Sequence, residues 1–260
     1  MEKYKDRPIG VFDSGQGGLT VLSRLVDLLP HENFVFYGDS GNAPYGVRTK
    51  EEVYQLSKRV VEHLINDHQV KAIMIACNTA TSAAAARLRA EYELPIIGIE
   101  PAAKPAVLEN PDQEVVVMAT PLTLRESKFN NLLQKYDKDH QVVKVPAPKL
   151  VELIEQGQTK SPELYSYLHQ VLDPYAGKAS AVVLGCTHFP FAKQAILDVL
   201  GHRTRVYDGA IGAANEVKHQ LAKRDQLTER TEAGRIIFEN SAPGASALSE
   251  ELYQLFRSEN

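Results

Sequence analysis

Short apolar runs alternate with longer segments of helical periodicity along most of the chain. The short runs are rich in Val and Ile and apolar at successive positions, as strands covered on both faces must be. The longer segments repeat apolar residues every three or four positions, as amphipathic helices do. The expected strands are Ile9–Phe12, Phe34–Tyr37, Ala72–Ala76, Ile96–Ile99, Val115–Met118, Val142–Val145, Ala181–Leu184 and Arg205–Tyr207. The expected helices are Leu19–Leu29, Glu51–Asp67, Ser82–Glu91, Leu124–Tyr136, Lys149–Glu155, Ser161–Leu172, Ala192–Leu200 and Ala213–Leu221.

This alternation predicts an α/β fold, because strand–helix–strand crossovers produce parallel sheets. A repeated spacing suggests that the chain has two similar halves. The interval from Asp13 to Cys77 is 64 residues, and that from Thr120 to Cys186 is 66. All four residues follow expected strands, at the end where open α/β sheets place ligands. We therefore expect two similar doubly wound domains with mostly parallel sheets and the active site in the cleft between them. The expected boundaries are 1–100 plus 208–260 for the first domain and 101–207 for the second.

Composition narrows the class of protein without naming an activity. The 260 residues are 43% hydrophobic and 24% charged, with a formal net charge of −4, which suits a globular protein with a sizeable core. Basic residues form no block, which argues against nucleic acid as a partner. The charged start does not resemble a secretory signal, and no apolar run approaches the roughly 20 residues of a membrane span. We expect a cytoplasmic enzyme or binding protein.

The two cysteines, Cys77 and Cys186, stand in matching settings, each between an apolar strand and an expected helix. A helix N-terminus offers free N–H groups and a positive dipole end, which stabilise a thiolate and can hold a carboxylate. Two such thiols on facing halves suit a reaction that removes a proton from one face of an atom and returns a proton to the other. That chemistry inverts an amino acid at its α-carbon, and fixed donors must stabilise the carbanion.

Four motifs carry a family resemblance, and they occur in order over residues 7 to 221. They are Phe12-Asp-Ser-Gly-Gln-Gly-Gly-Leu-Thr20, Tyr37-Gly-Asp39 with Ala43-Pro-Tyr-Gly46, Ala76-Cys-Asn-Thr-Ala80, and Gly185-Cys-Thr-His-Phe-Pro190. The chain resembles the glutamate racemase branch of the aspartate/glutamate racemases. The resemblance implies cofactor-independent interconversion of L- and D-glutamate, with D-glutamate supplied to peptidoglycan. It also implies no metal and, since such folds often dimerise, a homodimer.

The resemblance also assigns roles to residues. Cys77 and Cys186 would be the proton shuttles. Asp13, His188 and Glu155 would assist them, with Glu152 competing for the place of Glu155. The implied substrate-binding residues are Asp13, Ser14, Tyr45, Gly46, Asn78, Thr79, Thr187 and His188.

Other interpretations of these motifs are weaker. The glycines at 15–18 fit neither nucleotide-binding fingerprint, so a tight turn near the substrate is favoured. Cys186 and His188 are too close in sequence for the usual metal-ligand spacing, and a redox pair lacks Cys-x-x-Cys. Asp13 could merely cap the next helix, although Ser14 could take that role. Asp39 is read as a turn residue or a support of the site.

The remaining alternatives concern function and surface. The histidines outside the motifs, among them His63, His68 and His219, lie in polar helical stretches and are expected to be solvated. A racemase of another acidic amino acid, such as aspartate, would share the same scaffold. A noncatalytic member of the fold, binding an amino acid or a protein, would not need both thiols.

Overall fold

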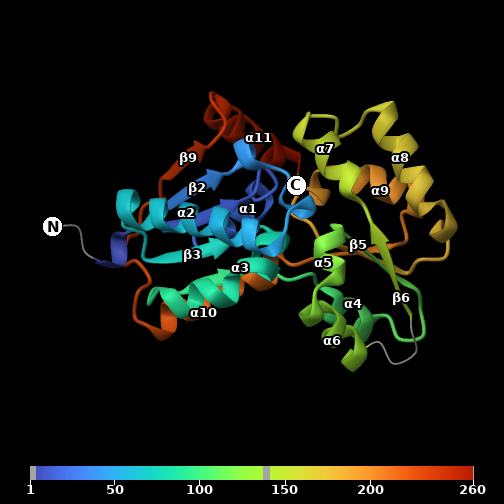
Figure 1. The fold of residues 1–260 in the computed structure, drawn as a ribbon, viewed down its shortest axis with the longest axis horizontal. Coiled ribbons are helices and arrows are strands. Elements are labelled where there is room, and N and C mark those ends of the chain that lie inside the picture. Colours follow the sequence, from blue (N-terminus) through green and yellow to red (C-terminus); the bar gives the residue numbers. More distant parts are fainter. Residues whose placement is uncertain (1–3, 137–140, 260) are drawn as a thin grey trace. The chain divides into compact units, whose positions relative to one another are not determined.

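The computed structural model describes residues 4–136 and 141–259, and the chain divides into two compact units (Figure 1). The first unit is Met1–Ile99 with Ala210–Asn260, and the second is Glu100–Gly209. Each unit is built on a parallel sheet with helices on both faces, which confirms the predicted α/β class.

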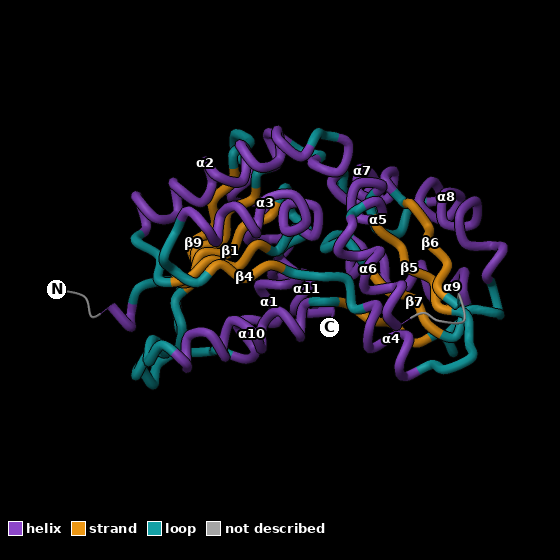
Figure 2. Tube along the Cα trace, turned by 60° about the horizontal axis from the view of Figure 1, so that its bottom comes forward, coloured by secondary structure: helices purple, strands orange, loops and turns teal. Residues whose placement is uncertain are grey.

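The first unit brings together the two ends of the sequence. Its larger elements are β1 (Ile9–Asp13), α1 (Leu19–Leu28), β2 (Phe34–Gly38), α2 (Lys50–His68), β3 (Ala72–Ile75), α3 (Asn78–Glu91), β4 (Ile96–Gly98), α10 (Ala210–Lys223), β9 (Ile236–Asn240) and α11 (Ala245–Glu259). The strand order is β4-β3-β1-β2-β9, and all neighbours are parallel. Helices α2 and α3 pack together on one face of the sheet, and α1 packs with α10 and α11 on the other (Figure 2).

The second unit repeats this plan on a smaller sheet. Its larger elements are α4 (Ala103–Glu109), β5 (Val115–Ala119), α5 (Pro121–Arg125), α6 (Ser127–Tyr136), β6 (Val142–Pro146), α7 (Pro148–Glu155), α8 (Pro162–Leu172), β7 (Ala181–Leu184), α9 (Lys193–Leu200) and β8 (Arg205–Asp208). The strand order is β6-β5-β7-β8, again with parallel neighbours.

Alternation of side chains along the central strands explains why these runs are apolar throughout. Successive strand residues point to opposite faces of a sheet. Val116 and Val182 accordingly pack in a cluster with residues of α7, α8 and α9. Val117 and Val183 pack on the other face with residues of α4 and α6. Both faces are buried, so an alternating polar pattern could not be accommodated.

The helices begin at recognisable caps. Thr49 and Glu52 form a capping box at the start of α2, each side chain bonding to the backbone N–H of the other. Thr120 and Ser161 cap α5 and α8, and each is followed by a proline at the first helical position. Each of these polar residues marks the start of a helix, and Thr120 stands directly between β5 and α5.

Several elements differ from the sequence expectation. The strand β9 and the helices α4 and α11 were not predicted. The single helix expected over 124–136 is two helices, because the backbone is extended at Glu126. Within the described residues, no helix has both the length and the apolar character needed to cross a membrane.

Candidate active site

Cys77 lies two residues after β3 and is the N-cap of α3, as the strand–cysteine–helix pattern predicts. Its sulfur accepts a hydrogen bond from the backbone N–H of Ala80 at 3.4 Å. The Ser14 hydroxyl lies 3.3 Å from the same sulfur. The thiol is buried, so these contacts take the place of water around it.

Asp13 and Ser14 reach this position because β1 ends beside β3. Asp13 is fully buried, and its carboxylate accepts the N–H of Gly15 at 3.0 Å. The turn passes so close that a Cβ on Gly18 would lie 2.6 Å from the Cβ of Asp13. Helix α1 begins after Gly18 without a side-chain cap, so neither Asp13 nor Ser14 caps it. The capping roles considered for Asp13 and Ser14 are therefore not found, and the Ser14 hydroxyl lies beside Cys77 instead.

A short 3-10 turn, Tyr45–Val47, places Tyr45 and Gly46 in the same unit. The phenol of Tyr45 donates to Asp39 at 2.5 Å, and Asn42 donates to the other carboxylate oxygen at 2.9 Å. Burial raises the pKa of Tyr45, and the negative charges of Asp39, Cys77 and Asp13 raise it further. Tyr45 therefore stays protonated and acts as a donor.

Asn78 and Thr79 form the first turn of α3 beside Cys77, and both are buried. Among the described residues, none donates a hydrogen bond to the buried Oδ1 of Asn78. A buried acceptor without a donor costs roughly 1–3 kcal/mol. This oxygen is thus suited to receive an N–H from a bound molecule.

The second unit holds Cys186 in a different environment. The Nδ1 atom of His188 lies 3.7 Å from the Cys186 sulfur, and its Nε2 atom makes a short contact with Glu155. Burial by itself lowers the pKa of His188, but hydrogen bonds and charges from Cys186 and Glu155 raise it well above its usual value. The three side chains form a thiol–imidazole–carboxylate chain.

The backbone around Cys186 departs from the predicted pattern. Cys186 follows β7, but the next element is a 3-10 helix, Phe189–Ala192, and α9 begins only at Lys193. The expectation that Cys186 opens an α-helix as Cys77 does is therefore wrong. A Cβ on Gly185 would lie 2.8 Å from the carbonyl oxygen of Met118, so glycine lets the chain turn closely past β5.

Helix α7 presents both candidate acids, and they face different surroundings. Glu155 is the last residue of the helix and contacts the buried His188. Glu152 is exposed, and its charge acts on Tyr167. Of the two acids, Glu155 is thus the one in contact with the histidine that lies beside Cys186. Thr187, between Cys186 and His188 in the sequence, is also buried.

The structure groups the sequence-predicted residues by unit. The first unit holds Asp13, Ser14, Tyr45, Gly46, Cys77, Asn78 and Thr79, and the second holds Glu155, Cys186, Thr187 and His188. Asp39, left open between two roles, is buried and bonded to Tyr45. Its position at the end of an expected strand was the sequence feature that could have indicated a role in the site.

The prediction of solvated histidines is wrong at two positions. His63 and His68 are partly buried, and both contact Glu239 on β9. The sequence could not show this, because β9 returns to the first sheet from more than 160 residues away. His219 is exposed, as predicted.

Comparison with known proteins identifies the class to which this fold and these motifs belong. Residues 9–217 match the model of the Asp/Glu/Hydantoin racemase family, and the chain belongs to that family. The chain is an amino-acid racemase.

Within this family, the chain is similar to proteins named as glutamate racemases. The chain is 48% identical over 240 residues to a glutamate racemase of Clostridium kluyveri, covering 91% of this chain and 93% of the relative. It is similar to the structure of glutamate racemase from Francisella tularensis in complex with D-glutamate, with a TM-score of 0.81 and 28% identity over 96% of this chain and 94% of that one. It is also similar to Escherichia coli glutamate racemase in complex with L-glutamate and the activator UDP-MurNAc-ala, with a TM-score of 0.83 and 26% identity over 96% of this chain and 95% of that one.

Proposed function

We propose that this racemase interconverts L- and D-glutamate without a cofactor, with Cys77 and Cys186 as the two acid/bases. The observation that carries the proposal is that each unit holds one buried thiol at the carboxyl end of its sheet, in contact with groups that can stabilise or exchange its proton. Relatives that are named for glutamate or bind it support glutamate as the substrate. The D-glutamate formed would supply peptidoglycan.

The reaction requires one thiolate and one thiol on opposite faces of the α-carbon. The thiolate removes the α-proton, and the electron pair of the broken C–H bond passes into the carboxylate as an enediolate-like carbanion. The second thiol then donates its proton to the other face, so the roles of the sulfur atoms are exchanged after each turnover. At the second-unit thiol, His188 can hold the proton, because its imidazole contacts both the Cys186 sulfur and Glu155.

Substrate groups have complementary partners in the first unit. The unsatisfied Oδ1 of Asn78 is positioned as an acceptor for the α-ammonium group. The start of α3 can hold a carboxylate through backbone N–H groups other than that of Ala80, which donates to Cys77. Holding that carboxylate with fixed donors stabilises the charge that develops on it during proton removal.

Isotope incorporation tests the proposal directly. The full chain is incubated in heavy water with L-glutamate and no added cofactor, and α-deuterium and optical rotation are followed. We expect deuterium in D-glutamate from the first turnovers, because the returning proton comes from a thiol exchanged with solvent. If neither deuterium nor optical rotation changes, the proposal is wrong.

Variants of the two cysteines separate the mechanism from simple binding. Cys77→Ala and Cys186→Ala should each abolish racemisation, since one thiol cannot complete the cycle. Ser57→Ala, which removes a buried hydroxyl on α2, is the control and should retain turnover. Near-normal racemisation by either cysteine variant would contradict the two-base assignment. If the protein only binds an amino acid, neither wild type nor any variant would racemise glutamate. If kcat/KM is higher for aspartate than for glutamate, aspartate is the substrate.

A further inference from the structure

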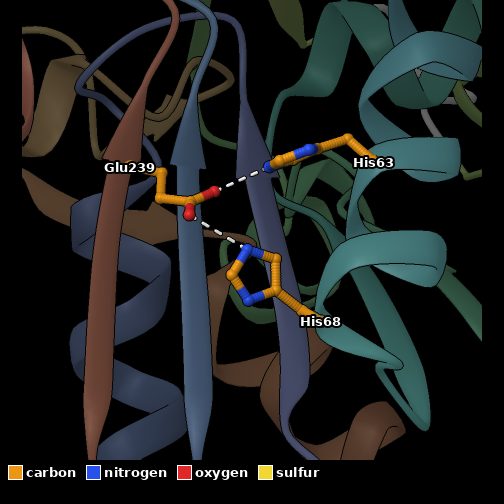
Figure 3. A group of neighbouring side chains, drawn as sticks. All are labelled: His63, His68 and Glu239. Atoms are coloured by element: carbon orange, nitrogen blue, oxygen red, sulfur yellow. Dashed lines mark hydrogen bonds and ion pairs between the residues drawn. The ribbon is translucent and has the colours of Figure 1, made fainter.

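A cluster of three metal-ligating side chains lies outside the residues proposed for racemisation. His63 Nε2 lies 2.7 Å from one carboxylate oxygen of Glu239, and His68 Nε2 lies 3.0 Å from the other (Figure 3). One potential ligand atom from each of the three residues lies within 4.8 Å of the others. None of the three belongs to the groups around Cys77 or Cys186.

The fold brings these residues together from two distant parts of the chain. His63 lies in the last turns of α2, and His68 is its final residue. Glu239 lies on the edge strand β9, opposite Tyr37 of β2 in the sheet register. Figure 3 shows the two imidazole rings pointing from α2 toward the Glu239 carboxylate.

We propose that His63, His68 and Glu239 bind a divalent cation of the zinc class. Two imidazole nitrogens and one carboxylate oxygen form a donor set that zinc accepts, whereas Mg²⁺ and Ca²⁺ prefer oxygen alone. The side chains of His63, His68 and Glu239 are 33%, 16% and 30% exposed, so water can enter as a fourth ligand.

A second carboxylate prepares His63 for this role. Asp67 lies 2.6 Å from the Nδ1 atom of His63. A proton on Nδ1 donated to Asp67 leaves the Nε2 lone pair directed at the cation, which is the usual carboxylate–histidine–metal arrangement. With neutral histidines, Asp67 and Glu239 contribute two negative charges that a dication balances.

Other charged and titratable groups near the cluster affect how strongly protons compete with a cation for the histidine nitrogens. The Tyr37 ring of β2 lies beside the His63 ring, tilted by 57° with 5.2 Å between centroids, and the charge of Arg59 of α2 acts on Tyr37. A protonated His63 between Asp67 and Glu239 would satisfy the same contacts as a cation does. Metal binding must release that proton, so its affinity is lower in acid.

A bound cation would fasten the edge strand β9 to α2. Both histidines belong to α2, whereas Glu239 belongs to the segment that returns to the first unit after α10. The cation would therefore close a long chain loop in the folded state only, and the stabilisation should rise with the logarithm of its concentration relative to Kd.

Titration of the full-length protein with Zn²⁺ tests the proposal. After treatment with a chelator and dialysis, Zn²⁺ binding is measured by calorimetry near neutral pH, and the thermal midpoint is recorded with and without Zn²⁺. We expect one ion per chain and a raised midpoint. Glu239→Gln and His68→Gln should each weaken binding at least about a hundredfold, and Asp67→Asn by about tenfold to a hundredfold. His169→Gln, which removes an exposed histidine paired with Asp173, is the control and should not change the affinity.

Cobalt distinguishes this site from the thiols. Co²⁺ bound by nitrogen and oxygen should absorb in the visible region without a thiolate charge-transfer band in the near ultraviolet. A thiolate band, the absence of one-to-one binding, or equal affinity in wild type and the folded Glu239→Gln variant would each overturn the proposal. Circular dichroism of each variant shows whether it is folded, and His68→Gln serves if Glu239→Gln is not.

Discussion

At the scale of single residues, Cys77 and Cys186 are both buried but are held by different groups. The Cys77 sulfur accepts the N–H of Ala80 and lies 3.3 Å from the Ser14 hydroxyl, and both groups can stabilise a thiolate. The Cys186 sulfur contacts an imidazole that is itself bonded to Glu155, and an imidazole can store the proton of the thiol. The two directions of proton transfer should therefore depend differently on pH.

The first prediction concerns Glu155→Gln. The pKa of His188 is raised well above its usual value, against the effect of burial, by Cys186 and Glu155. Removing the Glu155 charge should lower that pKa, so the alkaline limb of the kcat profile moves to lower pH. The loss of kcat should be about a hundredfold, near the lower end of what a positioned acid or base contributes. Initial rates in both directions across the pH range measure both effects.

The same variant has a stability signature with a definite sign. A histidine whose folded pKa is raised stabilises the fold most below its unfolded pKa, near 6.5, and that stabilisation is lost as pH rises through the folded pKa. Wild type should therefore exceed Glu155→Gln in unfolding free energy by more at pH 6 than at alkaline pH. Glu152→Gln, an exposed change on the same helix, is the control. An equal or larger effect of Glu152→Gln on kcat would favour the competing assignment.

Glu155 also shows where residue-level prediction reaches its limit. Cys77, Asn78 and Thr79 were placed by a local pattern, a strand followed by a helix start. Glu152 and Glu155 are three residues apart on one helix, so both fall on nearly the same side and periodicity cannot separate them. Contact with His188, from a different element, makes the distinction.

At the scale of elements, the segment between β2 and α2 depends on one buried carboxylate. Asp39 accepts hydrogen bonds from Asn42 and from the phenol of Tyr45, and so fixes the turn that carries Tyr45 and Gly46. The alternative of a plain turn residue understates this role, because Asp39 is almost fully buried. Only the folded turn reveals that Tyr45 points back at it.

The second prediction concerns Asp39→Asn. An amide keeps the shape but accepts more weakly than a carboxylate and loses the charge-assisted bonds, each worth about 1.5–3 kcal/mol. The turn should loosen, and KM for glutamate should rise about tenfold with a smaller change in kcat. Steady-state kinetics measure both. Glu62→Gln, which alters a carboxylate–phenol pair with Tyr92 elsewhere in the unit, should leave KM unchanged; a similar KM increase there would contradict a specific role for Asp39.

The predicted boundaries of helices were wrong where the backbone geometry changes but the apolar pattern of the sequence does not. Apolar residues at 189–192 fit both an α-helix and a 3-10 helix, because the i to i+3 spacing is common to both. The structure has a 3-10 helix there, so Cys186 lacks the α-helix start that Cys77 has. Likewise, nothing in the apolar pattern over 124–136 marks the extended residue at Glu126.

At the scale of the whole chain, the sequence predicted the parallel α/β plan but not the pairings between its distant ends. The strand β9 joins β2 from some 200 residues away, and its apolar run, Ile236–Phe238, is only three residues long. Helix α11 packs on α1, and its buried Ser249 donates to Gln16 in the turn after β1 at 2.8 Å. The amphipathic pattern of α11 is present in the sequence, but which elements it contacts depends on tertiary position.

The amino ends of the strands in the first unit carry a buried ion pair, at the other end of β3 from Cys77. Lys71, directly before β3, is fully buried and lies 2.6 Å from Glu32, just before β2. Its ammonium also donates to the carbonyl of Gln226, and Glu32 accepts the N–H of Thr228. Burial lowers the pKa of Lys71, while the Glu32 contact opposes that shift. The pair fastens the segment after α10 to the sheet.

In the first unit, the proposed chemistry lies at the carboxyl ends of the strands and the ion pair at their amino ends, so a change to the ion pair should affect stability and not catalysis. Lys71→Met leaves the Glu32 carboxylate buried without its partner, and should lower the unfolding free energy by about 3–5 kcal/mol. Below the unfolding transition, kcat/KM should stay near the wild-type value, because the carboxyl-end residues are unchanged. Lys58→Met, which breaks the partly exposed pair with Glu91, should lower the unfolding free energy much less than Lys71→Met does. Urea unfolding and kinetics on each variant measure these quantities, and adding Glu32→Gln to Lys71→Met should restore part of the loss. A fall in kcat/KM as large as that of the cysteine variants, in a folded Lys71→Met protein, would show that the two ends of the sheet are not independent.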